Sequence, residues 1–487
     1  MWSNELTPCL YGSTLGTLFY MVDFSGMSKK AEMQRVRVDC GFSVEELAGL
    51  VRFVQSYNYL HEYTNVRFFA DQIWKKIPSD WLRYLSTLSN AELNVFPFED
   101  PSPECPESLR RFLVDSHRCN LLSNYVERYG YDGLWNSVVE KSEMKMNIRI
   151  GAKKQHEINR LARLITEYCR VYRVKRIVDV GCGIGHLLNL LSPMFDVIGV
   201  ECDQILCSAG KKRYPSVKYE NLTLKAADAD EERVLNIFCG QKGERSAIVS
   251  LHGCGDLQPD LLQWFTQLPK HRVPLLFTIA CCYHKMSCAG KPVMEWALSN
   301  ALRSVCRNDW VLHKSALRLA CQGQLSRWPS SKEKRDAHCT CFLQRALLEC
   351  VYENSGIDAI RRFPRHLNRS FRELQSVGTE IAERLKLDSE ERAKVIRGYK
   401  SAYSEHQYLF DTVEPFTMLQ ALMQMPLESL ILADRYLYLT ESGCATCVLP
   451  LFDSKISPRN FCLIRNERLR FLLSFIKIIG SRAEGIT

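Results

Sequence analysis

The sequence predicts an α/β fold in which a mostly parallel sheet is flanked by helices, preceded by a helical region and interrupted by a helical insertion. Three observations support this prediction. Short β-type runs alternate with helical stretches between residues 177 and 280, a pattern typical of a parallel sheet with helices on its faces. A glycine-rich turn follows the first of these runs. Two late runs, joined by a turn rich in Pro, Ser and Asp, indicate a closing antiparallel hairpin.

The length and composition indicate a globular protein with more than one structural unit. The chain has 487 residues, of which 46% are hydrophobic, and this is too long for one ordinary core. We expect no membrane-spanning helix, because no run of about 20 uncharged apolar residues is present. The first 27 residues lack the basic start of a signal peptide and the Arg-rich pattern of a transit peptide. The 21 cysteines are therefore expected to be reduced thiols, in the cytoplasm or the nucleus.

Changes in the periodicity of apolar residues divide the chain into six segments. Spacings of three and four predict helices, and alternating β-type runs predict the sheet. The predicted segments are, in chain order, a loose N-terminal tail (1–43), a helical N-terminal domain (44–145), a sheet core with five strands (146–300), a basic helical insertion (301–425), the end of the core with the last hairpin (426–470) and a C-terminal tail (471–487).

The glycine-rich turn marks the first candidate binding site. The stretch from Arg176 to Leu187 reads RIVDVGCGIGHL, so that a buried strand runs into glycines at positions 181, 183 and 185 before a helix opens. The N–H groups at such a helix start are free to meet a ligand. The dinucleotide pattern G-x-G-x-x-G places its third glycine one position later. The spacing of Gly181, Gly183 and Gly185 therefore argues against NAD.

Acidic residues around this turn favour S-adenosylmethionine. Glu201 ends the second strand, where a carboxylate can accept hydrogen bonds from two ribose hydroxyls. Asp179, two residues before the first glycine, can accept from the ammonium group of S-adenosylmethionine, whereas a pyrophosphate needs only donors. The glycine turn and the acid at the end of the second strand resemble those of class I methyltransferases. This resemblance implies that Asp228, with Asp230 as second choice, lies near the adenine amino group. The alternative for both is a solvated acid in the first turn of a helix.

The methyl acceptor is expected beyond the ends of the fourth and fifth strands, because ligands of open α/β sheets bind there. The segments LHGCGD and ACCYHK follow these strands. Histidine titrates near neutral pH, so His252 or His284 is a candidate to take a proton from the acceptor. His252 and Tyr283 are candidates to orient it, and His252 also to contact the cofactor. Capping a turn or packing in the core are the structural alternatives.

Several other chemistries are not supported. The Asn/Asp-Pro-Pro-aromatic run of adenine N6 methylation is absent after the fourth strand, and so is the Pro-Cys context of cytosine C5 methylation. We expect no metal site, because Cys444 and Cys447 form one C-x-x-C pair but no second pair stands at zinc-finger spacing from it. Cys281 and Cys282 are expected to be small buried residues at a strand end. The residues whose type would suit zinc are Cys254, Cys281, Cys282, His284, Cys288, His338, Cys339, Cys341, Cys444 and Cys447.

Five segments together resemble the methyltransferase-like 25 family, also labelled ribosomal RNA adenine dimethylase domain-containing, within the class I S-adenosylmethionine-dependent methyltransferases. They are KKQHEINRL from Lys153, VDVGCGIGHL from Val178, LHGCGDL from Leu251, IACCYHKMS from Ile279 and VLPLFDSKISPRN from Val448. The resemblance implies a Rossmann-like, seven-stranded sheet closed by an antiparallel hairpin, and dependence on S-adenosylmethionine. It fixes no substrate. LHGCGD and CCYH also resemble tRNA 2′-O-methyltransferases with a Cys/His-rich loop, which favours an RNA hydroxyl.

We therefore predict an S-adenosylmethionine-dependent methyltransferase that acts on RNA. A protein methyltransferase and a catalytically silent binding module of the same fold are the alternatives. The net charge of +9 permits a nucleic-acid partner. A basic stretch is a candidate to face phosphates, although nearby acids make a solvated surface the alternative; its residues are Arg361, Arg362, Arg365, Arg369 and Arg372. The sequence leaves the oligomeric state open.

Overall fold

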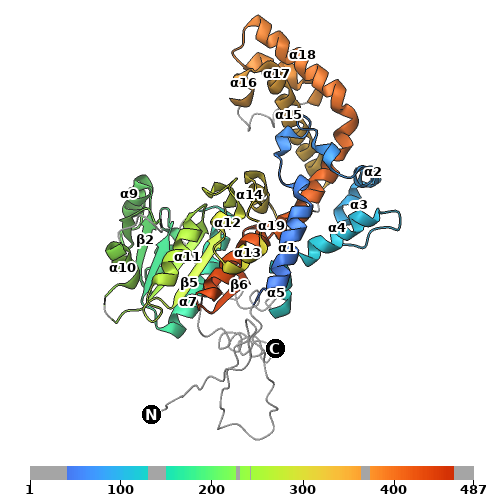
Figure 1. Cartoon of the computed structure of the whole chain (residues 1–487). Coiled ribbons are helices and arrows are strands. Elements are labelled where there is room, and N and C mark those ends of the chain that lie inside the picture. Colours follow the sequence, from blue (N-terminus) through green and yellow to red (C-terminus); the bar gives the residue numbers. More distant parts are fainter. Residues whose placement is uncertain are drawn as a thin grey trace, which may run out of the picture.

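The computed structural model describes residues 41–129, 150–225, 231–241, 243–328, 330–362 and 373–465. Within these ranges a central sheet with its flanking helices forms one part of the molecule, and two groups of helices form the rest (Figure 1). The long helix α19 (Val413–Glu441) runs between the sheet and the helical parts. The predicted α/β class, with a helical N-terminal region and a helical insertion, is confirmed.

The sheet has seven strands in the order β3-β2-β1-β4-β5-β7-β6. The first five strands in sequence pair in parallel, and β7 pairs antiparallel with both β5 and β6. The predicted closing hairpin is therefore confirmed. The strands are β1 (Arg176–Val180), β2 (Asp196–Glu201), β3 (Lys218–Asn221), β4 (Ser246–Gly253), β5 (Leu275–Ala280), β6 (Thr446–Pro450) and β7 (Phe461–Arg465). The order reverses at β1 and β4, so ligands are expected beyond the carboxyl ends of these strands.

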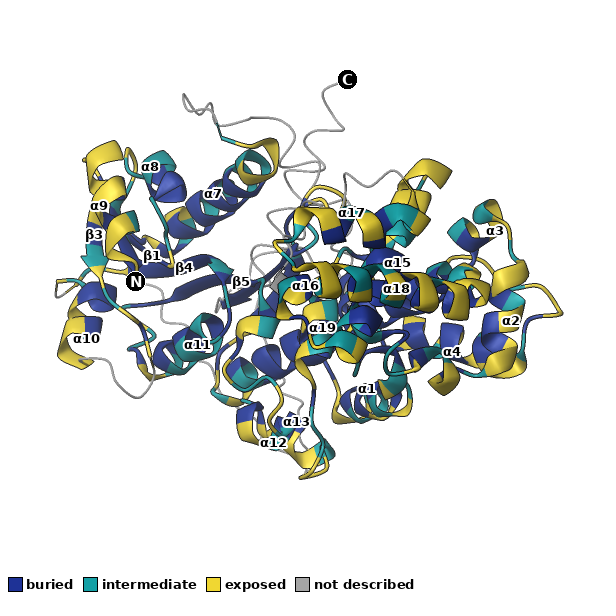
Figure 2. Ribbon diagram, turned by 90° about the horizontal axis from the view of Figure 1, so that it is seen from above, coloured by how far each residue is buried: buried dark blue, intermediate teal, exposed yellow. Residues whose placement is uncertain are grey.

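Helices cover both faces of the sheet, and α7 and α8 lie on one side while α11 lies on the other (Figure 2). The central strands are buried over nearly their whole length, which explains their continuous apolar runs. The helices of this part are α7 (Ala152–Tyr172), α8 (His186–Leu191), α9 (Gln204–Arg213), α10 (Glu231–Cys239) and α11 (Leu257–Gln267).

The N-terminal region is helical from Val44, as predicted. The helix α1 starts with a capping box, in which Ser43 accepts from the backbone of Glu46 and Glu46 accepts from the backbone of Ser43. The part of the predicted domain beyond Tyr129, up to residue 145, lies outside the described residues. The helices are α1 (Val44–Ser56), α2 (Ser79–Thr87), α3 (Asn90–Val95), α4 (Glu107–Arg118) and α5 (Leu121–Tyr129), with short 3₁₀ turns η1 (Asn58–Leu60), η2 (Asn65–Arg67) and η3 (Ile73–Lys76).

The insertion is helical, and part of it forms a lobe at some distance from the sheet, built from α15 to α18 (Figure 1). Its first helices lie closer to the sheet. The elements are η4 (Tyr283–Lys285), α12 (Val293–Trp296), α13 (Asn300–Val305), α14 (Lys314–Ala320), η5 (Leu325–Arg327), α15 (Lys332–Ser355), α16 (Asp358–Arg362), η7 (Leu374–Ser376), α17 (Val377–Arg384), α18 (Ser389–His406) and η8 (Gln407–Thr412).

The helix α19 crosses the predicted boundary between the insertion and the end of the core. The sequence places this boundary at residue 425, but α19 continues through Pro426. Most of its 29 residues are buried on all sides, as expected of a helix enclosed between several neighbours. The helical stretch Ser389–Glu441 is long and apolar enough to cross a membrane by length and composition, but 94% of its apolar window is buried inside the protein. Tertiary packing therefore accounts for its apolar character.

The predicted phosphate-facing stretch is only partly described. Arg361 forms an ion pair with Glu349 at 2.6 Å, and its guanidinium group lies 3.6 Å from the ring centroid of Tyr352. Arg361 is thus engaged within its own lobe. Arg365, Arg369 and Arg372, and the side chain of Arg362, lie outside the described residues.

Candidate cofactor and acceptor site

The glycine turn after β1 has the backbone shape that the sequence predicts. Gly181, Gly183 and Gly185 all have positive φ, a region that side-chain-bearing residues rarely adopt. A Cβ atom added at Gly183 would meet no atom within 4 Å, so this side of the turn is open to a ligand. The turn leads directly into α8.

Asp179 near the end of β1 is a buried acid with an unused acceptor. Its side chain is 3% exposed, and its Oδ1 atom has no hydrogen-bond partner among the described residues. Burial raises the pKa of Asp179 to about 8; Lys154 opposes this effect and Glu201 adds to it. Among the described residues Asp179 forms no ion pair, and the charge of Lys154 does not offset the effect of burial. The ammonium group of S-adenosylmethionine would supply a cationic partner. Asp179 therefore fits its predicted role.

Glu201 at the end of β2 holds the glycine turn in place. Its Oε2 atom accepts a hydrogen bond from the backbone N–H of Gly183 at 2.9 Å. Its Oε1 atom accepts from the N–H of Asp203 at 3.1 Å and from the thiol of Cys202 at 3.4 Å. An ionised carboxylate offers about four acceptor positions, so capacity remains for a ribose hydroxyl, and more if the weak thiol bond is exchanged. The structure thus adds a positioning role to the predicted binding role.

Asp228 and Asp230, the predicted adenine contacts, lie outside the described residues. Their assignment stays a prediction.

His252 on β4 is paired with an acid that no local sequence signal singles out. The Nε2 atom of His252 lies 3.3 Å from Oε2 of Glu157, which belongs to α7 and is 2% exposed. Ser457, from the turn between β6 and β7, donates to Oε1 of the same carboxylate at 2.7 Å. Burial raises the pKa of Glu157, but the hydrogen bonds from His252 and Ser457 outweigh it, and the pKa lies below its ordinary value. Glu157 is therefore ionised near neutral pH and orients the imidazole of His252.

One signal that could have pointed to Glu157 is its place in the segment KKQHEINRL, one of the five that carry the resemblance. The neighbouring residues on α7 are mostly apolar and buried, so the sequence indicates a core helix and not a site for Glu157. An acid on a mostly buried helix cannot be matched to a histidine 95 residues away without the fold.

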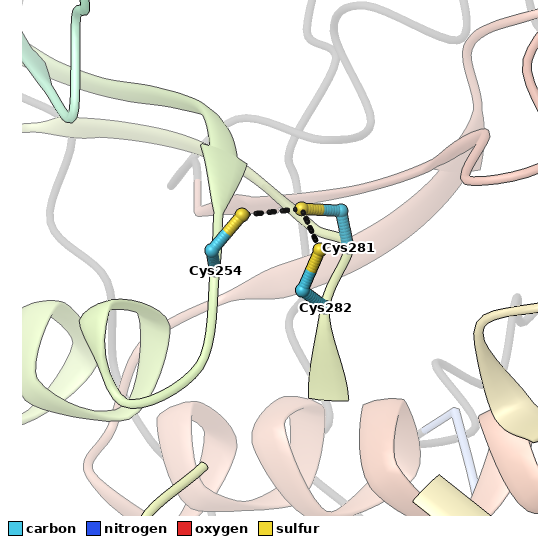
Figure 3. Close-up of side chains that lie close together, drawn as sticks. All are labelled: Cys254, Cys281 and Cys282. Atoms are coloured by element: carbon cyan, nitrogen blue, oxygen red, sulfur yellow. Dashed lines mark hydrogen bonds between the residues drawn. The ribbon is translucent and has the colours of Figure 1, made fainter. Parts of the chain in front are cut away.

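Three cysteines converge beyond the ends of β4 and β5 (Figure 3). The Sγ atom of Cys281 lies 2.8 Å from that of Cys254 and 3.5 Å from that of Cys282. All three are partly exposed, so the expectation that Cys281 and Cys282 are buried at a strand end is wrong. Among the residues that the structure describes, they are the one group of three or more potential ligands whose donor atoms all lie within 4.8 Å of one another.

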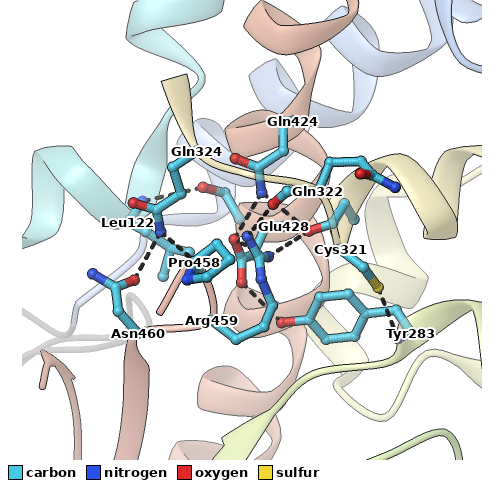
Figure 4. A network of polar contacts seen from close by, with 12 residues as sticks. Leu122, Tyr283, Cys321, Gln322, Gln324, Gln424, Glu428, Pro458, Arg459 and Asn460 are labelled. Carbon is cyan, nitrogen blue, oxygen red and sulfur yellow. Dashed lines mark hydrogen bonds and ion pairs between the residues drawn. The ribbon is translucent and has the colours of Figure 1, made fainter. Parts of the chain in front are cut away.

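Tyr283 points into the protein rather than toward an open surface (Figure 4). It is 3% exposed, and its hydroxyl donates to Oε1 of Glu428 on α19 at 3.1 Å. Glu428 in turn forms a 2.5 Å ion pair with Arg459, which also donates to the backbone carbonyl of Gln322. The expected direct contact between Tyr283 and the acceptor does not fit this arrangement, because the hydroxyl is committed to a buried network. Tyr283 instead positions the loop after β5.

His284 lies beside Tyr283 and is partly buried. Its Nδ1 atom is buried and has no hydrogen-bond partner among the described residues. Burial lowers the pKa of His284, and the nearby cations Arg318, Lys285 and Lys314 lower it further. The imidazole is therefore neutral near pH 7 and retains a lone pair that can accept a proton.

These features define a class I methyltransferase domain. A glycine turn follows β1, an acid ends β2, and a parallel sheet closes with an antiparallel hairpin. Residues 153–289 match the family described as a methyltransferase domain. The chain is similar to the probable methyltransferase-like protein 25 of Mus musculus, with 27% identity over 241 residues, covering 45% of this chain and 37% of the mouse protein. The Homo sapiens protein of that name is 25% identical over 233 residues, with the same coverage. The similarity thus spans well under half of these relatives.

Solved structures of methyltransferases are also similar to part of the chain, as two examples illustrate. An S-adenosylmethionine-dependent methyltransferase from Clostridium acetobutylicum is 17% identical, covers 27% of this chain and 55% of its own, and has a TM-score of 0.19. A TehB-like methyltransferase from Corynebacterium glutamicum is 22% identical, covers 32% of this chain and 70% of its own, and has a TM-score of 0.18. The strand order, rather than these superpositions, defines the fold.

Proposed function

We propose that this protein is an S-adenosylmethionine-dependent methyltransferase that acts on RNA. The observation that carries the first half of this proposal is the buried Oδ1 atom of Asp179, which has no hydrogen-bond partner among the described residues. Gly183, four residues further along the chain, leaves one side of the turn open. A cationic amino-acid group fits this position, and the glycine turn lets a ligand approach the backbone closely. The remaining acceptor positions of Glu201 support its assignment to the ribose hydroxyls. When bound, S-adenosylmethionine supplies an activated methyl group.

The residues around the acceptor act by position and by proton transfer. His252 is held by the carboxylate of Glu157, which fixes the orientation of the ring and stabilises the imidazolium form once a proton has been taken up. An acceptor hydroxyl or protonated nitrogen beyond the end of β4 would transfer its proton to this imidazole. Neutral His284 is the second candidate for the base.

Exposed cations support RNA as the acceptor. Lys285 lies in the loop after β5, and Lys314 and Arg318 on α14 lie close enough to His284 to influence its charge. Lys153 and Lys154 are exposed at the start of α7. The Nζ atom of Lys153 lies 3.7 Å from Oε1 of Glu157, the carboxylate that holds His252. Positive charge around an acceptor site attracts the phosphates of a nucleic acid and raises its local concentration.

The experiment compares RNA with protein as the acceptor. RNA and protein from cells that lack this protein are each incubated with the purified chain and S-adenosylmethionine carrying a labelled methyl group. We expect label in the RNA fraction that nuclease releases and protease does not. Label in protein alone would make the chain a protein methyltransferase. Binding of S-adenosylmethionine with no transfer to either would support the silent binding module.

Charge reversal tests the cationic surface with a matched control. The double variant Lys314→Glu/Arg318→Glu should weaken RNA binding and reduce the slope of its salt dependence by about 0.7–0.9 for each phosphate that is no longer neutralised. The control is Lys211→Glu/Lys212→Glu, in the last turn of α9. This helix follows β2 and runs back along the sheet, so its C-terminal end lies near the amino ends of the strands, away from the proposed site. Equal weakening by both pairs would indicate non-specific attraction and no acceptor surface at α14.

A further inference from the structure

The three cysteines beyond β4 and β5 are brought together by the register of the two strands. Ser250 pairs with Thr278, but Gly253 pairs with Ala280, so β4 contains one extra residue between these pairs. This β-bulge sets Cys254 directly opposite Cys281, one residue beyond the last pair. In an unbroken register Cys254 would lie opposite Cys282 instead. Bulges re-aim side chains at functional sites in this manner.

The two loops are also held together after the strands end. The backbone N–H of Gly255 donates to the carbonyl of Cys282 at 3.3 Å. Gly255 has a φ of +59°, and a Cβ atom at this position would lie 2.9 Å from the backbone carbonyl oxygen of Lys285. Only glycine permits this close approach without a shift of the backbone. The cysteine cluster is therefore built by the main chain as well as by its side chains.

We propose that Cys254, Cys281 and Cys282 bind a thiophilic divalent metal ion, with Zn²⁺ as the ion that the ligand set fits best. Three thiolates are a soft donor set, which selects zinc over magnesium or calcium. With Zn–S bonds of about 2.3 Å, two sulfurs of a tetrahedral site are about 3.8 Å apart. The sulfurs here are 2.8 and 3.5 Å apart in two of the three pairs, and within 4.8 Å in the third. Small rotations of the side chains would bring them to this spacing.

The cluster offers three protein ligands and leaves a fourth position. Within the described residues no other His, Cys, Asp or Glu places a donor atom within 4.8 Å of all three sulfurs. Three protein ligands with a fourth position for water or substrate are typical of catalytic zinc, whereas structural zinc takes four protein ligands. Zinc with three thiolates carries a net charge of −1, and exposed Lys285 lies three residues after Cys282. Cys254 lies two residues after His252 of β4, so the site adjoins the proposed acceptor site and goes beyond the methyl transfer proposed above. This proposal departs from the expectation from sequence that the chain has no metal site, and the experiment below tests the two against each other.

The number of cysteines in the cluster favours a metal site over a disulfide. A disulfide would join Cys254 to Cys281 and leave Cys282 without a role. A metal ion uses all three sulfurs. The two cases differ in metal content, in the number of free thiols and in the mass of the protein, so measurements on the wild-type chain separate them.

The test uses the full chain, purified under reducing conditions, treated with a chelator and titrated with Zn²⁺ or Co²⁺ alone. We expect one ion per chain, and for Co²⁺ the thiolate-to-metal charge-transfer bands and strong visible bands of a tetrahedral sulfur site. Cys254→Ser, Cys281→Ser and Cys282→Ser should each reduce the metal content to below one tenth of the wild-type value. Cys341→Ser, on α15 and partly buried, is the control and should retain it.

The wild-type measurement does not depend on any variant folding, and circular dichroism checks the fold of each variant. Absence of charge-transfer bands with Co²⁺ and of any retained Zn²⁺ would overturn the proposal. So would full metal content in the triple serine variant. The disulfide is tested on a second sample of the chain, purified without reductant or chelator. If this protein contains no metal, is two thiols short and is two hydrogens lighter, with neither difference seen in Cys254→Ser, it contains the disulfide instead. Binding of S-adenosylmethionine is measured in parallel, so that failure of the metal site is distinguished from failure of the cofactor site.

Discussion

The Nε2 atom of His252 lies 3.3 Å from the Oε2 atom of Glu157, and this contact joins the end of β4 to the first turns of α7. The acid is buried and accepts a hydrogen bond from Ser457 of the closing hairpin, so three distant segments of the chain meet at one carboxylate. The pair connects the sheet edge where the cofactor is expected with the loop where the acceptor is expected.

The first prediction concerns this pair. His252→Ala should lower turnover by about 10²-fold, as expected when a general base is removed. Glu157→Gln keeps the size of the side chain but removes its charge. It should lower turnover by about tenfold, because the imidazole of His252 is no longer held in its orientation. Affinity for S-adenosylmethionine should stay unchanged, because the contact is made with the acceptor in the transition state. Methyl-transfer kinetics and calorimetry measure the two quantities.

The matched control for this pair is Ser457→Ala, which removes one hydrogen bond to Glu157 and keeps the hydrogen bond between Glu157 and His252. A smaller decrease in turnover is expected. If Glu157→Gln lowered cofactor affinity as much as turnover, Glu157 would serve the cofactor and not the base.

The second prediction concerns the pH dependence of cofactor binding. The pKa of Asp179 is raised to about 8 by burial, so the free protein carries a protonated carboxyl group at pH 7. A cationic ligand favours the ionised form, and binding must therefore release a proton. Affinity should rise by about tenfold per pH unit as the pH increases toward 8. Asp179→Asn should bind weakly with no such pH dependence. Calorimetry in buffers of different ionisation enthalpy measures the released proton.

The same group links stability of the free protein to pH. Because the pKa of folded Asp179 lies above the ordinary carboxyl value, its contribution to the free energy of unfolding is fully present at low pH. This contribution declines as the pH rises from the ordinary carboxyl value toward 8. Urea unfolding at pH 6 and pH 8 should show this decrease in the wild type and a smaller one in Asp179→Asn. A decrease of equal size in both proteins would assign it to other groups.

The third prediction concerns Glu201. Glu201→Ala should weaken S-adenosylmethionine binding by about 1.5–3 kcal/mol, the range for hydrogen bonds to a charged group. It should also lower thermal stability, because the N–H of Gly183 loses its acceptor. Glu220→Ala on β3 removes a solvent-exposed ion pair with Arg233 and is the control. It should leave both quantities nearly unchanged. Unchanged affinity in Glu201→Ala would refute the ribose assignment.

The fourth prediction concerns the buried network around Tyr283. Tyr283→Phe keeps the ring and removes one hydrogen bond to Glu428, so the free energy of unfolding should fall by about 1–3 kcal/mol. Glu428→Ala removes the carboxylate that pairs with buried Arg459, so the free energy of unfolding should fall by about 3–5 kcal/mol. Denaturant unfolding measures both. Turnover of Tyr283→Phe should fall while cofactor affinity is kept, because the loop after β5 is displaced. A slower rate at unchanged stability would instead support direct contact of the Tyr283 hydroxyl with the acceptor.

The sheet and its cofactor edge could be predicted because their signals are local. The alternating apolar runs, the glycine spacing after β1 and the acid at the end of β2 each lie within a few residues of one another. Backbone geometry at the glycines follows directly from residue type. The boundary predicted at residue 425 does not coincide with the end of a helix. Packing against neighbours on all sides keeps α19 continuous through Pro426, and this packing has no local signal in the sequence.

The sequence by itself determined the fold class, the glycine turn and the placing of Asp179 and Glu201 at one edge of the sheet, because strand and turn propensities act over short stretches. Only the tertiary structure decided which side chains from distant segments meet at this edge of the sheet. One extra residue in β4 sets Cys254 opposite Cys281, and packing of α7 against the sheet brings Glu157 to His252. Burial against α19 turns Tyr283 inward. These relationships depend on register and packing between segments far apart in the chain, and no local pattern encodes them.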